Sequence, residues 1–297
     1  MRILVSGVSG PIGAALLPSL QSRGHRVTRL VRGRPVGEAQ ISWDPARSLA
    51  PESVSGFEAV IHLAGETVVG RWTAAKKARI RDSRVLGTRR LAQALAQASS
   101  RPRVLITASA VGYYGDRGDE ILREDSPPGQ GFLPEVCREW EAATKPAAAA
   151  GIRTAQVRIG LVLSPVGGAL QKMLTPFKLG LGGNMGNGRQ WWSWIDVEDL
   201  VGAIRHILEN DRLAGPVNAV APNPVTNAEF TKTLARVLSR PAIFPMPAFA
   251  ARLAFGQMAD ELLLASQRVE PCKLLAVGYA FRHSDLRAAL SNLRQRR

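Results

Sequence analysis

The chain has 297 residues, enough to bury a large core as one extended α/β domain or as a nucleotide-binding domain with a smaller lobe. Its 45% hydrophobic content is typical of a globular protein, and no uncharged apolar run reaches the roughly 18 residues that predict a membrane span. The net charge of +15 is spread along the chain without a DNA- or RNA-binding motif, so we expect neither nucleic acid nor membrane as a partner.

The first residues and the cysteines indicate where the protein works. A buried strand already begins at residue 3, which leaves no room for a targeting peptide, so we predict a cytoplasmic protein. The two cysteines, Cys137 and Cys272, offer neither a disulfide framework nor the ligand spacing of a metal site, and we predict no bound metal. The sequence leaves open whether the protein is a monomer or a homodimer.

The chain opens with a short strand, a glycine-rich turn and a helix. Apolar residues occupy 3–5 and 14–20, and the turn between them contains Gly7, Gly10, Pro11, Ile12 and Gly13. Glycines at this spacing let the backbone turn tightly and approach a pyrophosphate, which binds to the unpaired N–H groups of the helix N-terminus. Because the motif directly follows a strand and opens a helix, it predicts a dinucleotide site.

The end of the second predicted strand, 27–31, indicates which dinucleotide binds. A site for NAD carries a carboxylate there to hold the ribose 2′-hydroxyl, whereas a site for the 2′-phosphate of NADP carries arginine. In this chain Arg32 follows the strand, and the first carboxylate is Glu38. A guanidinium can bind a phosphate through two parallel hydrogen bonds. We therefore predict NADP as the cofactor, with Arg32 on its 2′-phosphate.

Strands and helices alternate through the first half of the chain. Further buried strands are predicted at 59–63, 104–108 and 156–163, and helices at 74–98 and 135–150. One face of the helix at 74–98 carries Ile80, Gly87, Leu91 and Leu95. Arg84 lies on the same face, so its side chain points toward the sheet. This alternation predicts an α/β fold with a doubly wound parallel Rossmann sheet.

After residue 164 the pattern changes and predicts a smaller lobe. Glycine-rich loops surround a helix at 169–179, a helix at 197–208 and a strand at 216–220 return to the sheet, and the chain from Asn227 is mainly helical. We therefore assign residues 1–165, with 195–222 returning to them, to an NADP-binding Rossmann domain. Residues 166–194 and 223–297 form a mostly helical substrate lobe.

Three groups of residues resemble the extended short-chain dehydrogenase/reductases. They are His62–Glu66 after the third predicted strand, Val85–Thr88 in the next helix, and Ser109 with Tyr113–Gly115 after the fourth strand. More narrowly, the whole chain resembles the atypical "epimerase family" branch (NAD-dependent epimerase/dehydratase-like), with marks at 43–45, 71–72, 140–143, 193–195, 227–230 and 269–279. That branch ends in a small C-terminal domain and has no settled substrate.

The resemblance implies a cofactor site and assigns residues to it. Gly7, Gly10 and Gly13 would contact the pyrophosphate, and Arg32 the 2′-phosphate. The adenosine side would be lined by Leu63, Ala64 and Gly65. The segment 158–161, with Ile159 and Gly160, would pass the nicotinamide end. Pro11, Ile12, Glu66, Arg84 and Ser109 complete the predicted cofactor-binding set.

The resemblance also implies a catalytic pair that this chain lacks. In the wider superfamily a Tyr-x-x-x-Lys helix supplies the acid/base, and the lysine lowers the tyrosine pKa from its ordinary value of about 10. Aligned on Trp140, Leu133 takes the tyrosine position, Cys137 the lysine position and Arg84 that of a supporting asparagine. No Tyr-x-x-x-Lys occurs anywhere in the chain, and of the catalytic residues only Ser109 remains.

Three candidates to replace that pair each have a structural alternative. Tyr113 or Tyr114 could supply a phenol beside Ser109, or could pack as a core residue. Arg84 on an apolar face needs a polar or anionic partner, which a cofactor phosphate, a bound carboxylate or Glu66 would provide. Cys137 could act as a nucleophile, although a buried helical cysteine more often packs as a small hydrophobe.

Three tryptophans and one aspartate lie close together in the sequence after the glycine-rich loop. The tryptophans at 191, 192 and 194 could wall an apolar pocket or belong to the core. Asp196 lies where relatives of the branch often have histidine, and we assign it no catalytic role.

We expect an NADP(H)-binding oxidoreductase that acts on a carbonyl or alcohol of an unidentified small molecule, with Ser109, Tyr113 and Tyr114 as catalytic candidates. Two alternatives remain. One is a non-catalytic NADP(H)-binding redox sensor that signals through its C-terminal lobe. The other is a nucleotide-sugar epimerase or dehydratase, which the missing base disfavours.

Overall fold

The centre of the protein is a seven-stranded sheet, seen in a computed structural model that describes residues 1–295. All its strands run parallel, in the order β11-β7-β5-β4-β1-β2-β3. They are β1 (Arg2–Ser6), β2 (Arg26–Val31), β3 (Gln40–Ser42), β4 (Ala59–His62), β5 (Val104–Ala110), β7 (Arg153–Ile159) and β11 (Gly215–Ala219). The prediction of a doubly wound parallel α/β sheet is confirmed.

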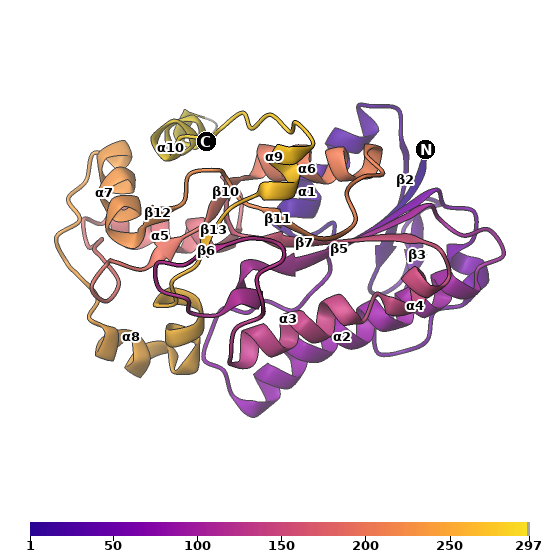
Figure 1. Ribbon diagram of the computed structural model, residues 1–297, viewed down its shortest axis with the longest axis horizontal. Helices are drawn as coiled ribbons and strands as arrows, with labels where there is room; N and C mark the ends of the chain where they lie inside the picture. The colour runs from indigo at the N-terminus through magenta and orange to yellow at the C-terminus, as the bar shows by residue number, and fades with distance from the viewer. Residues whose placement is uncertain (296–297) are drawn as a thin grey trace.

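Helices cover both faces of the sheet, which is why its central strands are apolar along their whole length. One face carries α1 (Pro11–Gln21) and α6 (Val197–Glu209), and the other carries α2 (Ala74–Gln97), α3 (Phe132–Ala142) and α4 (Lys145–Ala149) (Figure 1). The buried face of α2 contains the predicted apolar stripe, in which Ile80, Leu91 and Leu95 are wholly buried. A short 3-10 turn (Pro51–Val54) precedes β4, and another (Val111–Tyr114) follows β5.

Two predicted elements are interrupted. The helix predicted over 135–150 is broken between α3 and α4, because Pro146 lacks an N–H group and would clash with the carbonyl group one helical turn before it. The strand predicted over 156–163 ends at Ile159. A Cβ atom at Gly160 would lie 2.5 Å from the Ser193 carbonyl oxygen. The chain then forms β8 (Leu161–Leu163), which pairs with β10 (Trp194–Asp196).

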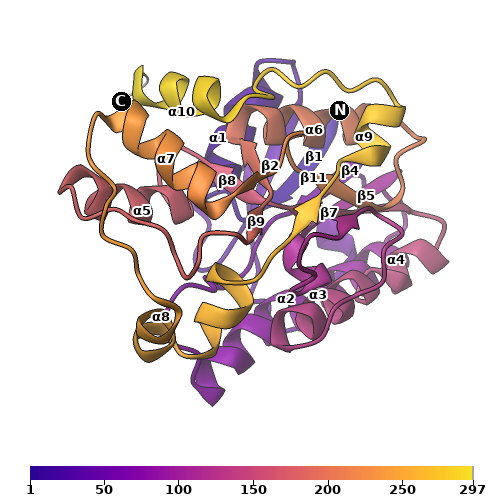
Figure 2. The same ribbon diagram turned by 60° about the vertical axis from the view of Figure 1, so that its left-hand side comes forward.

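A second lobe lies at one end of the sheet (Figure 2). It contains α5 (Gly168–Lys178), α7 (Asn227–Leu238), α8 (Ala248–Phe255), a π-helical turn (Ala259–Leu263) and α10 (Leu286–Gln295). Strands β9 (Trp191–Trp192) and β12 (Val225–Thr226) pair beside them. The lobe has its own apolar core, to which α5, α7 and α10 contribute leucines. Among the residues that the structure describes, no helix has both the length and the apolar character of a membrane span.

Part of the C-terminal segment contacts the Rossmann layer rather than the lobe. Strand β13 (Arg268–Val269) pairs with β6 (Ile121–Leu122), and α9 (Cys272–Ala276) follows it. The Tyr279 hydroxyl donates to the carbonyl oxygen of Asp199 in α6 at 2.8 Å. The chain after residue 223 therefore joins the two halves of the molecule.

Candidate functional site

The carboxyl ends of β1 and β4 form the crevice in which this fold binds ligands, because the strand order reverses at β1. Gly7 follows β1 with a φ of +77°, a conformation that L residues rarely adopt. A Cβ atom there would lie 2.6 Å from the carbonyl carbon of Leu63 and 2.7 Å from the amide nitrogen of Ala64. The turn after β1 and the turn after β4 therefore approach each other only because residue 7 is glycine.

The other two glycines of the turn have different tasks. A Cβ atom on Gly13 would lie 2.6 Å from the Cα atom of Val8 and would also collide with the Gly7 carbonyl oxygen, so Gly13 is needed for helix packing. At Gly10 the nearest protein atom would be 3.5 Å away, which leaves open space beside the N-terminus of α1. No side chain caps that helix. The open space and the uncapped N–H groups fit a dinucleotide pyrophosphate.

The small lobe reaches this turn through the loop after β8. Cβ atoms at Gly167 and Gly168 would lie 3.7 and 3.8 Å from the ring of Pro11. Upstream in the loop, the Ser164 hydroxyl donates to the Val166 carbonyl oxygen at 2.8 Å and fixes its path. The N-termini of α1 and α5 are thus neighbours at the predicted pyrophosphate position.

Arg32 lies exposed directly after β2, as predicted. The Glu66 carboxylate, after β4, accepts a hydrogen bond from Lys76 Nζ at 2.6 Å. That bond, together with the positive charges of Lys76, Arg79 and Arg32, lowers the pKa of Glu66 below its ordinary value. Lys76 and Arg79 were not predicted as site residues, and their position in the first turns of α2 brings them to the same edge. The net charge around Glu66 is positive and suits a phosphate.

Arg84 lies beneath the turn after β4, with its guanidinium over the Trp140 ring at 5.1 Å. Its Nη1 donates to the carbonyl oxygens of Glu66 at 2.9 Å and Ile80 at 3.1 Å. The predicted contact with Glu66 is therefore made to the main chain, while the Glu66 carboxylate binds Lys76. The Nε and Nη2 atoms of Arg84 donate to no described residue. Burial lowers the pKa of Arg84, which remains charged at neutral pH.

Ser109, at the end of β5, belongs to a buried polar network. Its hydroxyl donates to Glu141 Oε1 at 2.7 Å, and only 3% of the residue is exposed. Arg158 of β7 donates to the same carboxylate from Nε at 2.8 Å and from Nη2 at 2.9 Å. Burial disfavours the charged guanidinium, but the bonds to Glu141 outweigh it and raise the pKa of Arg158. In this structure the Ser109 hydroxyl is engaged by Glu141, and its catalytic role stays a prediction.

Tyr114 extends that network and is also fully buried. Its hydroxyl accepts from Arg158 Nη1 at 2.9 Å and donates to Asn218 Oδ1 at 2.7 Å, and burial raises its pKa to about 12. These bonds and the raised pKa disfavour Tyr114 as the group that transfers a proton. Tyr113 is half-buried with its ring 3.5 Å from the Arg158 guanidinium, and its hydroxyl has no described partner. Of the two tyrosines, only Tyr113 keeps a free hydroxyl.

Glu141, Arg158 and Asn218 were not predicted as a unit. The available signal was the presence of charged residues inside apolar elements, at Arg158 in a buried strand and at Glu141 in a helix that packs on the sheet. Such charges require a partner.

The remaining candidates lie mainly in the core. Leu133 and Cys137 are buried on α3, and burial raises the pKa of the Cys137 thiol to about 12, so it is not a nucleophile. Trp194 and Trp192 are buried, whereas the indole of Trp191 donates to Asp119 at 2.7 Å. The Asp196 carboxylate caps α6 by accepting from the Glu198 amide at 2.8 Å. Ile159 is 9% exposed at the end of β7, next to Gly160.

Comparison with known proteins places the chain in a family. A family model described as the NAD dependent epimerase/dehydratase family matches residues 3–220. The chain belongs to that family. A second model, a domain of unknown function (DUF1731), matches residues 246–293. The resemblance to the epimerase-family branch and its C-terminal domain is thereby confirmed.

Relatives cover nearly the whole chain. Epimerase family protein Mb2239 of Mycobacterium bovis is 42% identical to this chain. The aligned region covers 97% of this chain and 96% of the Mb2239 chain. The crystal structure of human epimerase family protein SDR39U1 (isoform 2) with NADPH has a TM-score of 0.91 and 37% identity, covering 99% of both chains. The crystal structure of a nucleoside-diphosphate sugar epimerase from Corynebacterium glutamicum has a TM-score of 0.83 and 40% identity, covering 98% of this chain and 57% of that one.

Proposed function

We propose that this protein binds NADPH in the crevice between β1 and β4. The observation that carries the proposal is Arg32, an exposed guanidinium at the end of β2 with no carboxylate in the position that an NAD site uses. The open space at Gly10 and the uncapped start of α1 fit the pyrophosphate. A human relative that is 37% identical was crystallised with NADPH.

We further propose an oxidoreductase that acts on a carbonyl or alcohol of a small molecule in the cytoplasm. When bound, the nicotinamide supplies or accepts the hydride. The chain orients the reacting groups and stabilises the charge that develops on the substrate oxygen. Arg84 suits this task because its Nε and Nη2 atoms donate to no described residue and its guanidinium is partly desolvated. Tyr113 is the remaining candidate for delivering a proton, since its hydroxyl is free.

The burial of the other predicted catalytic residues favours a second function, one without catalysis. Ser109 is buried and hydrogen-bonded to Glu141, and burial raises the pKa of both Tyr114 and Cys137 to about 12. This supports a protein that binds NADPH and reports its presence through the small lobe, whose 167–168 segment contacts Pro11. An epimerase or dehydratase of nucleotide sugars, the activity in the name of the Corynebacterium relative, would need a base that the described crevice residues do not offer.

One experiment separates these functions. NADPH oxidation is followed with a panel of aldehydes, ketones and sugar nucleotides for the wild type, Arg84→Gln and, as a control on the exposed side of α2, Arg89→Gln. The oxidoreductase proposal predicts slow turnover that Arg84→Gln lowers by about a hundredfold, the effect of removing one donor to a developing charge, while Arg89→Gln keeps it. Silence across the panel with tight NADPH binding, and sugar nucleotides that are recovered unchanged, supports the sensor, because an epimerase or dehydratase would convert the sugar nucleotide without net NADPH oxidation.

A further inference from the structure

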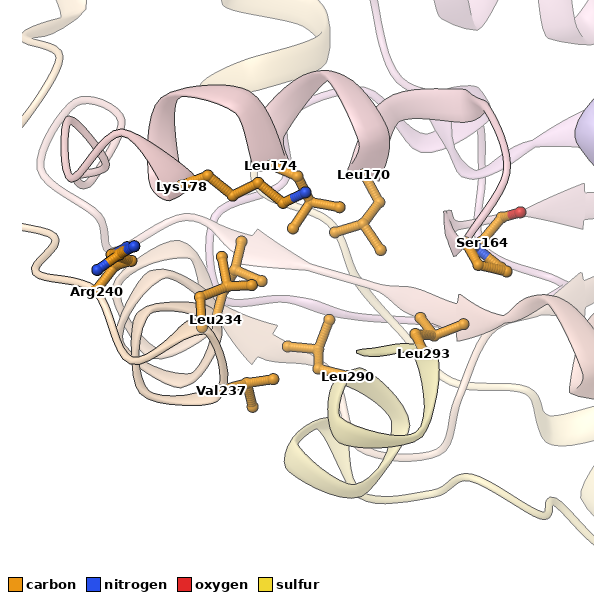
Figure 3. A pocket seen from close by; sticks show the side chains of 11 residues that line it. Ser164, Leu170, Leu174, Lys178, Leu234, Val237, Arg240, Leu290 and Leu293 are labelled. Atoms are coloured by element: carbon orange, nitrogen blue, oxygen red, sulfur yellow. The ribbon is translucent and has the colours of Figure 1, made fainter. Parts of the chain in front are cut away.

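A cavity of about 410 Å³ lies within the small lobe, enclosed by α5, α7 and α10 (Figure 3). This volume is within the range of pockets that hold small molecules. Most of its wall is formed by six leucines, namely Leu170, Leu174, Leu234, Leu238, Leu290 and Leu293. Such a surface offers water few hydrogen-bond partners and favours an apolar occupant.

The cavity is positively charged at one end. Lys178, the last residue of α5, and Arg240, which follows α7, are the two exposed cations of the lining; the Lys178 side chain runs back along α5 toward Leu174, Arg240 lies beyond Leu234, and Ser164 lies at the opposite end (Figure 3). Neither cation forms an ion pair or a side-chain hydrogen bond with a described residue. Among the described residues that line the cavity there is no aspartate or glutamate. Two free cations beside a leucine-lined space are complementary to an anion that carries an apolar tail.

A neighbouring hollow strengthens the charge at this end. Lys232, Arg236 and Arg240 line it on the other side of α7, and its described lining again contains no carboxylate. Arg240 belongs to both spaces. The positive potential therefore extends beyond the cavity mouth, which would attract an anionic head group and repel a cationic one.

We propose that this cavity binds an alkyl carboxylate, with the chain along the leucines and the carboxylate paired with Lys178 and Arg240. The distance along α5 from Leu170 to Lys178 is about 12 Å at the helical rise of 1.5 Å per residue, which matches an extended chain of about eight to ten carbons. Ser164 and Pro165 line its far end. The occupant therefore lies beside the loop that contacts the glycine-rich turn and outside the crevice between β1 and β4.

Calorimetric titration of the full chain with decanoate tests the proposal. We expect saturable binding of one decanoate and none of decyltrimethylammonium, which has the same tail and the opposite charge. Lys178→Glu and Arg240→Glu should each weaken decanoate binding at least tenfold. Lys172→Glu is the matched control, because Lys172 is exposed on the same helix and does not line the cavity. The proposal is overturned if all three variants bind decanoate with the same affinity. It is also overturned if decyltrimethylammonium binds as decanoate does.

A chain-length series on the wild type keeps the test independent of the variants. Affinity should rise from butanoate through hexanoate and octanoate and level off near decanoate, where the chain fills the cavity. Absence of saturable binding for every member, or an affinity that does not depend on chain length, contradicts an alkyl carboxylate site.

Discussion

Glu141 and Arg158 form a doubly hydrogen-bonded ion pair, Nε to Oε1 at 2.8 Å and Nη2 to Oε2 at 2.9 Å, that links α3 to β7 below the crevice. Arg158 is 2% exposed, so removal of its partner would leave a buried, unpaired charge. We expect Glu141→Ala to lower the free energy of unfolding by about 3–5 kcal/mol, the usual cost of breaking a buried pair.

The matched control for that change is on the same helix. Glu139 pairs with Arg81, which is 55% exposed, and Glu139→Ala should cost less than about 1 kcal/mol because water screens the pair. Urea unfolding of both variants gives the comparison. Equal losses would show that the buried network does not stabilise the fold in the way described.

Substitution of Tyr113 and of Tyr114, which follow β5, should have different effects on the free energy of unfolding and on activity. Tyr114→Phe removes a hydroxyl that bonds Arg158 and Asn218, and we expect a loss of about 1–3 kcal/mol. Tyr113→Phe should change stability by no more than about 0.5 kcal/mol. Where NADPH oxidation is detectable, Tyr113→Phe should reduce it and Tyr114→Phe should not. The reverse pattern would restore Tyr114 as the catalytic candidate.

The fold could be predicted from the sequence because its signals are local and repeated. A strand, three glycines and an apolar helix identify the first β-α unit of the sheet. The apolar run at 104–108 indicates a further strand of the same sheet. The edge strand β3 was missed, since its three residues include only one apolar side chain, Ile41. The break at Gly160 was missed because the sequence does not show that the Ser193 carbonyl group, from a distant part of the chain, lies against this residue.

The candidate site was predictable only on its cofactor side. The roles of the glycines depend on backbone geometry that the motif itself encodes. Ser109 was expected to face a substrate, but the direction of its hydroxyl is decided by Glu141, 32 residues away. Similarly, Arg84 was correctly placed on the face of the helix that points toward the sheet. The sequence could not show that Lys76 binds the Glu66 carboxylate and that Arg84 therefore binds the Glu66 carbonyl oxygen.

Replacement of Gly13 or Gly10 by alanine should affect stability and NADPH affinity differently. Gly13→Ala introduces contacts with Val8 and Gly7 that the backbone must relieve, so it should destabilise the protein without any cofactor, by about 1–3 kcal/mol. Gly10→Ala has room in the protein and a φ of −79°, so its stability should change little while NADPH affinity falls. Thermal unfolding and NADPH titration of both variants test this. Unchanged NADPH affinity in Gly10→Ala would place the cofactor elsewhere.

His62, beside Ser6 at the ends of β4 and β1, should make stability depend on pH. Burial lowers its pKa from 6.5 to about 4. Below pH 6.5 the unfolded chain takes up a proton that the folded chain refuses. Stability is therefore complete above pH 6.5 and falls between pH 6.5 and 4 by about 1.4 kcal/mol per pH unit from this group. Urea unfolding across this range should show a shallower slope for His62→Gln than for the wild type. Parallel slopes would mean that His62 is charged in the folded protein.

The most direct test of the central claim is thermal unfolding with NADPH and with NADH at equal concentrations. A ligand at about a hundredfold excess over its Kd stabilises the fold by about 2.7 kcal/mol. The account predicts a clearly larger rise in Tm with NADPH for the wild type and for Arg34→Ala, whose exposed guanidinium lies two residues beyond Arg32. In Arg32→Ala the two cofactors should give similar, smaller rises. Equal rises with NADPH and NADH in the wild type would contradict the account.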